Sequence, residues 1–278
     1  MSRARKKQKQ QVVSQTLAAI SRFSMIEDKS RVLVALSGGK DSSLLAYLLR
    51  DIATWHGKAF SLSAINVKTD ITCGGCARES GIREFAKSID LPLEISRIRI
   101  RDRLAEGQEP DCFICSWNRR KAIFQYATSH GFDRVAFGHH QDDFVETALM
   151  NLFYNGEFAS MAPRQEMFGG RLTIIRPLLF VPEKSIVSLV NMLGFSWSQC
   201  MCPYGERSKR VWVKNFLREA EKETKDIKGN IFRSALEKMR TMEGGFTPKR
   251  RPNMETAGAS GMGLPGGMRG AKDRRMQK

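Results

Sequence analysis

The stretch of residues 31–50 constrains the fold of this chain more than any other. It runs from a short apolar segment, residues 32–36, through Ser37-Gly38-Gly39-Lys40-Asp41-Ser42 into a segment with apolar residues at helical spacing. A strand, a glycine turn and a helix start form a phosphate cradle, because glycines allow close backbone approach and the first N–H groups of the helix point at the anion. The stretch therefore predicts a nucleotide site.

Two better-known phosphate loops do not fit this stretch. The kinase and GTPase loop requires glycine where Val34 stands and Ser or Thr where Asp41 stands. The dinucleotide fingerprint requires a third glycine at Ser42. Residues 37–42 instead resemble the PP-loop of the ATP pyrophosphatases, which implies that ATP is bound and cleaved between its α and β phosphates. A turn that merely joins strand to helix is the alternative, and the charged residues inside the turn disfavour it.

Composition and charge indicate a globular protein with a polyanionic partner. Hydrophobic residues make up 41% of the 278, and no apolar run reaches membrane-spanning length. Of the net charge of +17, residues 1–11 contribute +5 and residues 244–278 contribute +6, which leaves +6 for the body. A basic body with basic ends suits RNA as a partner. Solvated tails that keep the protein in solution are an alternative explanation for the positive charge of the two ends. Without the apolar core of a secretory signal, we expect a cytoplasmic protein that does not bind membranes.

Strand-like and helix-like segments alternate along the chain. The expected strands are residues 32–36, 60–67, 93–98, 134–137 and 172–175, and the expected helices outside the opening stretch are 12–23, 77–87, 119–130, 141–154, 182–193, 211–221 and 231–242. This order predicts an α/β fold with a parallel sheet sandwiched by helices and with ligands at the carboxyl ends of the strands. We expect a basic flexible arm (1–11), an N-terminal helix (12–30), the ATP-binding α/β domain with its cysteines (31–200), a C-terminal helical part (201–243) and a disordered basic tail rich in Gly and Met (244–278).

Residues 138–143, Gly-His-His-Gln-Asp-Asp, follow an expected strand and open an expected helix. An ATP site needs carboxylates to hold Mg2+, so Asp41, Asp142 and Asp143 are candidates for metal binding or reaction geometry. Asp142 and Asp143 point to different faces of the helix start, so we expect one of them to contact the metal directly. A capping cluster at the helix N-terminus is the alternative. The two histidines, His139 and His140, are candidate helix caps or nucleotide contacts.

Six cysteines in a chain that is not exported indicate metal or redox ligands rather than disulfides. They stand at positions 73, 76, 112, 115, 200 and 202. Cys112 and Cys115 form a Cys-x-x-Cys pair, and a third cysteine from downstream would complete a three-thiolate site that leaves one iron of a cubane cluster open to hold sulfide. Cys73 and Cys76 form a second such pair, and zinc held by both pairs is the alternative. Spacing alone does not distinguish an iron-sulfur cluster from zinc.

Ordered motifs over residues 20–242 resemble the tRNA 2-thiocytidine synthetase family. They are Phe23-Ser24-Met25-Ile26-Glu27, residues 37–42, Cys112-x-x-Cys115 with Arg119-Arg120, Gly138-His139-His140-x-Asp142-Asp143, Asn151-Leu152-Phe153-Tyr154, Met161-x-Pro163 and Ile175-Arg176-Pro177-Leu178. The resemblance implies a tRNA thiolase that uses ATP to adenylate the C2 oxygen of an anticodon-loop cytidine. Sulfur delivered by a 4Fe-4S cluster then replaces that oxygen and forms 2-thiocytidine.

The same resemblance implies roles for individual residues. Cys112, Cys115 and Cys202 become the cluster ligands, with Cys200 as the fallback for the third. The implied ATP contacts, with Mg2+ on Asp41 or Asp142, are Ser37, Gly38, Gly39, Lys40, Asp41, Ser42 and His139. Candidate contacts to tRNA phosphates are Arg119, Arg120, Lys121, Arg207, Lys209 and Arg210. Cys73 and Cys76 have no counterpart in the family pattern.

The expected partners are tRNA and a sulfur donor, either a cysteine desulfurase or sulfide, and a homodimer is left open. Two other functions fit part of the pattern. Another PP-loop enzyme that forms thiouridine or lysidine in tRNA would keep residues 37–42. A non-catalytic zinc-bearing RNA-binding protein would keep the cysteines, but the intact loop argues against it.

Overall fold

The computed structural model describes residues 3–55, 60–71, 77–104, 111–195, 197 and 209–242. The strands are β1 (Arg31–Ala35), β2 (Ser61–Thr69), β3 (Leu93–Ile98), β4 (Arg134–Ala136), β5 (Arg164–Met167) and β6 (Leu172–Ile175). The helices are α1 (Arg3–Arg22), α2 (Lys40–Trp55), α3 (Glu79–Ser88), α4 (Cys112–Ser129), α5 (Gln141–Asn155), α6 (Glu183–Leu193), α7 (Lys209–Glu223) and α8 (Ile227–Met242), with a 3-10 turn η1 (Arg101–Arg103). Strands and helices alternate up to α6 except at the β5–β6 pair, which confirms the predicted α/β class.

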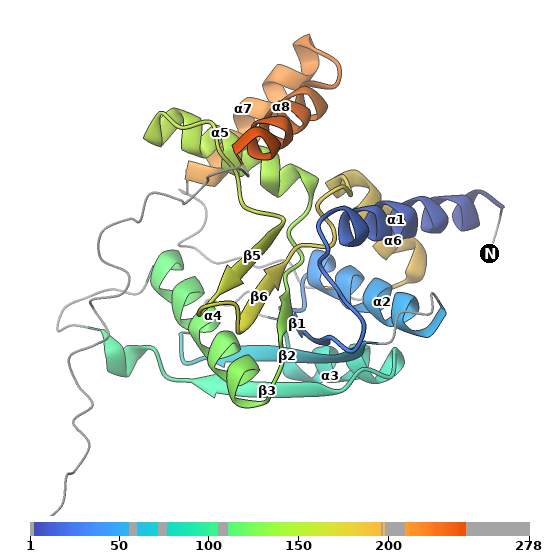
Figure 1. Cartoon of the computed structure of the whole chain (residues 1–278), viewed down its shortest axis with the longest axis vertical. Coiled ribbons are helices and arrows are strands. Elements are labelled where there is room, and N and C mark those ends of the chain that lie inside the picture. Colours follow the sequence, from blue (N-terminus) through green and yellow to red (C-terminus); the bar gives the residue numbers. More distant parts are fainter. Residues whose placement is uncertain are drawn as a thin grey trace, which may run out of the picture. The chain divides into compact units, whose positions relative to one another are not determined.

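The six strands form one sheet in the order β3-β2-β1-β4-β6-β5 (Figure 1). All neighbouring strands are parallel except β5, which runs antiparallel to β6 at the edge. Val34 of β1 is level with Ala136 of β4, which is level with Ile175 of β6. The order of the strands reverses between β1 and β4, since β2 lies on one side of β1 and β4 on the other. Such a switch point opens a crevice at the carboxyl ends of the strands.

Helices cover both faces of the sheet. Val32 and Val34 belong to a core that includes residues of α1, α2 and α6, whereas Leu33 points into a second core with Ile123 of α4. Figure 1 shows α4 on one side of the sheet and α1, α2 and α6 on the other. Because both faces are covered, the central strands are mostly apolar on both sides.

Four helices, α1, α4, α7 and α8, begin earlier than predicted, and the differences are largest for α1 and α4. Helix α1 begins at Arg3, so the basic segment that we expected to be a flexible arm is largely helical. Its Lys9 lies 3.1 Å from the Asp51 carboxylate of α2 and packs over the ring of Tyr47. Helix α4 begins at Cys112 rather than at residue 119, because Oδ1 of Asp111 accepts the Ile114 N–H at 2.6 Å and caps the first turn.

Strand β5 was not predicted. Its sequence, Arg-Gln-Glu-Met, lacks the apolar alternation of a strand, and it forms because residues 168–171 turn the chain back to pair with β6. Gly169 and Gly170 in that turn have φ of +67° and +84°. Of the helices that the structure describes, none combines the length and the apolar character that a membrane crossing requires. The expected tail, residues 244–278, lies outside the described residues.

Candidate nucleotide and cysteine site

The turn of residues 37–42 joins β1 to α2 at the switch point of the sheet. Gly38 has φ of +85°, and a side chain there would overlap the Cβ of Ala77, so glycine is required for both the backbone and the space. Oγ of Ser42 accepts the Ser37 N–H at 3.1 Å and lies 3.0 Å from the Gly39 carbonyl oxygen. Since α2 begins at Lys40, the N–H groups of its first turn and the turn itself face one space that suits an anion.

Lys40 supplies a fixed positive charge at this turn. Its Nζ lies 2.9 Å from Oε1 of Glu183 at the start of α6 and 3.2 Å from Oδ2 of Asp41. Burial lowers the pKa of Lys40, but the two carboxylates outweigh burial, so its pKa is raised. Lys40 therefore stays charged at neutral pH, and its position relative to the turn is held by a residue from another element.

The segment after β4 lies against this turn. A Cβ at Gly138 would stand 3.0 Å from the backbone of Asp41 and of Ser42, so only glycine allows this approach without a shift. Nε2 of the buried His140 lies 3.6 Å from Oδ1 of Asp41 and 3.4 Å from Oδ2 of Asp143. The structure thus brings Asp41 and Asp143, which are far apart in the sequence, to the same nitrogen of one imidazole.

Asp143 combines a capping role with an electrostatic one. Its Oδ2 accepts the backbone N–H of His140 at 3.1 Å, and its Oδ1 accepts a hydrogen bond from the Arg210 guanidinium of α7 at 2.9 Å. Burial raises the pKa of the Asp143 carboxyl, but His140, His139 and Arg210 outweigh burial, so this pKa is lowered. The carboxylate is therefore charged at neutral pH.

Asp142 has different surroundings from its neighbour. Its Oδ2 accepts the backbone N–H of Glu183 at 2.7 Å, and its Oδ1 lies 3.2 Å from Nζ of Lys228. The residue is only 7% exposed. Its carboxylate joins α5 to the start of α6 and to α8, and both of its oxygens have protein partners.

Positive groups gather beside Asp143. The pKa of His139 is lowered to about 3 by burial first and by the charges of Arg176, Arg120 and Arg210, against the opposing effect of Asp143. Burial and the charge of Arg120 lower the pKa of the Arg176 guanidinium to about 10. Within the described residues, neither Nε of Arg176 nor Nδ1 of His139 has a hydrogen-bond partner. Cations that gather without an equal number of carboxylates attract an anion.

Cys112 and Cys115 lie in the first turn of α4. Cys112 is exposed and Cys115 partly buried. A helix N-terminus lowers the pKa of a thiol in general, and two thiols at this spacing are donors that suit an iron-sulfur cluster. Helix α4 follows β3 and precedes β4, both of which belong to the parallel part of the sheet, so its first turn lies toward the carboxyl ends of the strands, as the turn of residues 37–42 does.

The other cysteines, at positions 73, 76, 200 and 202, lie outside the described residues. Among the residues that the structure does describe, no group of three or more His, Cys, Asp or Glu side chains is placed to hold a metal ion. The two thiols of α4 fit two corners of a three-thiolate site, and the third ligand stays a prediction. Arg207 also lies outside the described part of the chain.

Four buried or half-buried polar residues were missed as site residues. Glu146 stands three residues after Asp143 on α5, and its carboxylate lies 3.3 Å from Arg210 and 3.5 Å from Lys214. Burial raises the pKa of Glu146. Asn66 donates to the Leu36 carbonyl at 2.7 Å and joins β2 to the turn. Arg176 and Glu183 complete this set. A polar residue within an apolar strand, such as Asn66, was the available sequence signal.

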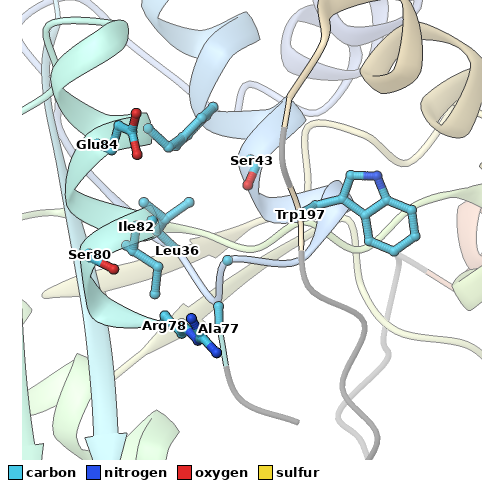
Figure 2. A pocket seen from close by; sticks show the side chains of 11 residues that line it. Leu36, Ser43, Ala77, Arg78, Ser80, Ile82, Glu84 and Trp197 are labelled. Carbon is cyan, nitrogen blue, oxygen red and sulfur yellow. The ribbon is translucent and has the colours of Figure 1, made fainter.

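A cavity of about 280 Å³ adjoins the turn at Gly38. Leu36 after β1 and Ser43 of α2 line it, the first turns of α3 line it from one side, and Trp197 stands on the opposite side (Figure 2). Ser80 and Glu84 add polar groups to this lining. The cavity places an aromatic ring and hydrogen-bonding groups within reach of a nucleotide that the turn would hold.

A strand, a glycine turn with a charged lysine and a helix start at a sheet switch point define a nucleotide-binding α/β protein. The model of the PP-loop domain family matches residues 6–221 of the chain. The chain is 31% identical over 221 residues to the tRNA-cytidine(32) 2-sulfurtransferase of Pelobacter propionicus, which covers 78% of this chain and 81% of that protein. Identity to the enzyme of the same name from Bdellovibrio bacteriovorus is 32% over 222 residues, with 78% and 84% covered. The chain therefore belongs to the PP-loop family and, within it, to the tRNA-cytidine 2-sulfurtransferases.

A solved structure supports the fold. The U34-tRNA thiolase NcsA of Methanococcus maripaludis, determined with its 4Fe-4S cluster, superposes with a TM-score of 0.70 at 23% identity, and the match covers 88% of this chain and 82% of that one. The resemblance to tRNA thiolases noted in the sequence is confirmed by these relatives, and the predicted fold is confirmed by this superposition.

Proposed function

We propose that this protein is an ATP-dependent tRNA thiolase that forms 2-thiocytidine. One feature of the fold supports the proposal: residues 37–42 follow β1, Asp143 follows β4, and α4 with Cys112 and Cys115 in its first turn follows β3, so all three belong to the carboxyl edge of the parallel strands. The names of the relatives given above support cytidine as the base. ATP, activation chemistry and thiol ligands would then meet in one site.

The reaction has two displacements. In the first, the C2 oxygen of the cytidine attacks the α-phosphorus of ATP, and pyrophosphate leaves. In the second, sulfide attacks C2, and AMP leaves with the former C2 oxygen. The oxygen of a base carbonyl is a poor leaving group until it is bound to AMP, so the first step makes the second feasible.

The residues of the turn would bind the pyrophosphate part of ATP. Backbone N–H groups of residues 38–42 and the ammonium of Lys40 compensate the negative charge that grows on the leaving pyrophosphate. Mg2+ would be held by Asp41, because carboxylate oxygens are its preferred protein ligands. His139 is neutral at physiological pH, since its pKa is lowered to about 3, and it would contact the nucleotide through hydrogen bonds rather than charge.

Cys112, Cys115 and Cys202 would hold the 4Fe-4S cluster, with Cys200 as the fallback ligand. When bound, such a cluster supplies an open iron that carries sulfur and keeps it from water. Arg120 and Arg176 would stabilise the anions that meet there. The sulfur donor would be a cysteine desulfurase or sulfide, the protein would act in the cytoplasm, and a homodimer is compatible with these roles.

Metal analysis and an activity assay on the same anaerobically purified protein test the proposal. We expect iron and acid-labile sulfide, AMP formation that depends on tRNA, and 2-thiocytidine in tRNA nucleosides by mass spectrometry. Cys112→Ala should lose iron and thiolation but still bind ATP, whereas the matched variant Ser116→Ala, one residue beyond the pair, should keep all three. Comparison of Cys200→Ala with Cys202→Ala identifies the third ligand.

Several results would contradict the proposal. Zinc in place of iron together with no AMP formation would indicate a non-catalytic RNA-binding protein. Thiouridine or lysidine as the product would keep the ATP chemistry but change the substrate. Full thiolation by Cys112→Ala would exclude the cluster from the reaction.

A further inference from the structure

An aromatic ridge lies on the surface where α5 ends and α7 begins. The ridge consists of Phe153, Tyr154, Trp212 and Phe216. Their exposed fractions are 43%, 43%, 52% and 42%. The rings contact one another: Phe153 meets Trp212 and Phe216 edge to face, both at 5.5 Å, and Trp212 and Phe216 are stacked at 5.9 Å. Large aromatic side chains that stay this exposed, as a contiguous group, mark interaction sites.

Positive charge accompanies the ridge. Nζ of Lys209 lies 4.2 Å from the ring centroid of Tyr154. Lys209, Trp212 and Phe216 follow one another at helical spacing along the outer side of α7, while Val213 and Leu217 of the same helix are buried. The surface therefore offers aromatic faces and the Lys209 cation side by side.

The ridge is continuous with the candidate active site. Arg210, the neighbour of Lys209 in α7, donates a hydrogen bond to the Asp143 carboxylate. Figure 1 shows α5 and α7 next to each other, and the same two helices carry both Asp143 and the ridge. A long ligand whose reacting group lies at Asp143 would reach the ridge.

We propose that the aromatic ridge binds unpaired bases of the tRNA loop that flank the target base. This proposal rests on the proposed function. A base in a loop has to leave its stack before its C2 atom can be reached, and its neighbours then need new stacking partners. Exposed aromatic rings provide such partners, and the adjacent Lys209 ammonium would pair with a backbone phosphate between the bases.

A second copy of this chain is a less suitable occupant. In a two-fold symmetric contact each patch meets itself. The contact would then hold Lys209 of both copies, and like charges in a contact are unfavourable. RNA brings phosphates to this cation instead.

Binding of two RNA ligands tests the proposal. The first is a hairpin with the loop of a substrate tRNA, and the second is a fully paired RNA duplex of the same length. We expect Trp212→Ala and Phe216→Ala each to weaken hairpin binding by about tenfold, the size of one base–aromatic stack, and to leave duplex binding unchanged. Trp212→Phe keeps a stacking ring and should retain most of the affinity.

Phe168→Ala provides the matched control. Phe168 is 47% exposed, like the ridge residues, but it lies in the turn before β6, at the end of that strand away from the site. Its loss should not change hairpin binding. Because the ridge side chains are exposed, we expect the variants to fold, and their thermal unfolding is measured to verify this.

Two outcomes would overturn the proposal. In one, Trp212→Ala and Phe216→Ala bind the hairpin as tightly as the wild type. In the other, sedimentation shows that these substitutions split a dimer while hairpin affinity stays the same. The formation of 2-thiocytidine by the wild-type protein is measured separately. If the wild type forms 2-thiocytidine but the ridge variants bind the hairpin normally, the role of the ridge is rejected and the proposed function is retained.

Discussion

Asp142 and Asp143 are neighbours with the same side chain, yet the structure predicts that their loss has different consequences. The Asp142 carboxylate lies between the backbone N–H of Glu183 and the ammonium of Lys228, at 2.7 and 3.2 Å. Asp142→Asn keeps an acceptor for Glu183 but loses the ion pair. Lys228 is 30% exposed and retains Glu221 at 3.1 Å, so it remains solvated and paired. We expect Asp142→Asn to lower the free energy of unfolding by about 1 kcal/mol.

Asp142→Ala removes the hydrogen bond to Glu183 as well. A hydrogen bond to a charged group contributes about 1.5–3 kcal/mol, so we expect Asp142→Ala to cost about 3 kcal/mol in total. If the proposed function holds, Asp143→Asn should instead reduce AMP formation by about a hundredfold or more, since the lost charge faces Arg210 and the imidazole that also lies next to Asp41. Asp142→Asn should retain most of that activity.

Urea unfolding followed by circular dichroism gives the free energies, and AMP formation with tRNA gives the activity. The variant Lys228→Met completes a double-mutant cycle with Asp142→Asn, and we expect a coupling of about 1 kcal/mol between the two. The reasoning is refuted if Asp142→Asn unfolds at the wild-type urea concentration but no longer forms AMP, because the carboxylate would then act on the ligand and not on α6 and α8.

Two further predictions concern the turn and the histidine beside it. Gly38→Ala should abolish ATP binding in equilibrium dialysis, because a Cβ there overlaps Ala77. Gly156 is the control, since it has φ of +64° and open space around it. Gly156→Ala should lower the free energy of unfolding by only the backbone cost of about 1–2 kcal/mol and should bind ATP normally. His139 has its pKa lowered to about 3 from 6.5, so the unfolded chain binds one more proton between these pH values and stability should fall as pH decreases through this window. His139→Asn should remove up to about one proton from that pH dependence of urea unfolding, whereas a measured His139 pKa near 6.5 by NMR would contradict the prediction.

The sequence alone determined the features that short stretches of chain encode. The bounds of β3 and β6 agree with the predicted strands, and the turn of residues 37–42 lies between a strand and a helix as expected. These features depend on local apolar runs and glycine turns, which act within a few residues. The start of α4 could also have been predicted from the sequence, because aspartate, the residue at position 111, is favoured at the N-cap.

Only the tertiary structure decided how charged residues are used. Strand β5 has no apolar pattern of its own and exists because β6 pairs with it. Asp142 and Asp143 look alike in the sequence, but Lys228 pairs with the first and Arg210 with the second. Arg210 is 67 residues away from Asp143, and no local pattern relates them. Chain folding selects such partners because a buried charge is stable only where a distant segment supplies its counter-charge or hydrogen bonds.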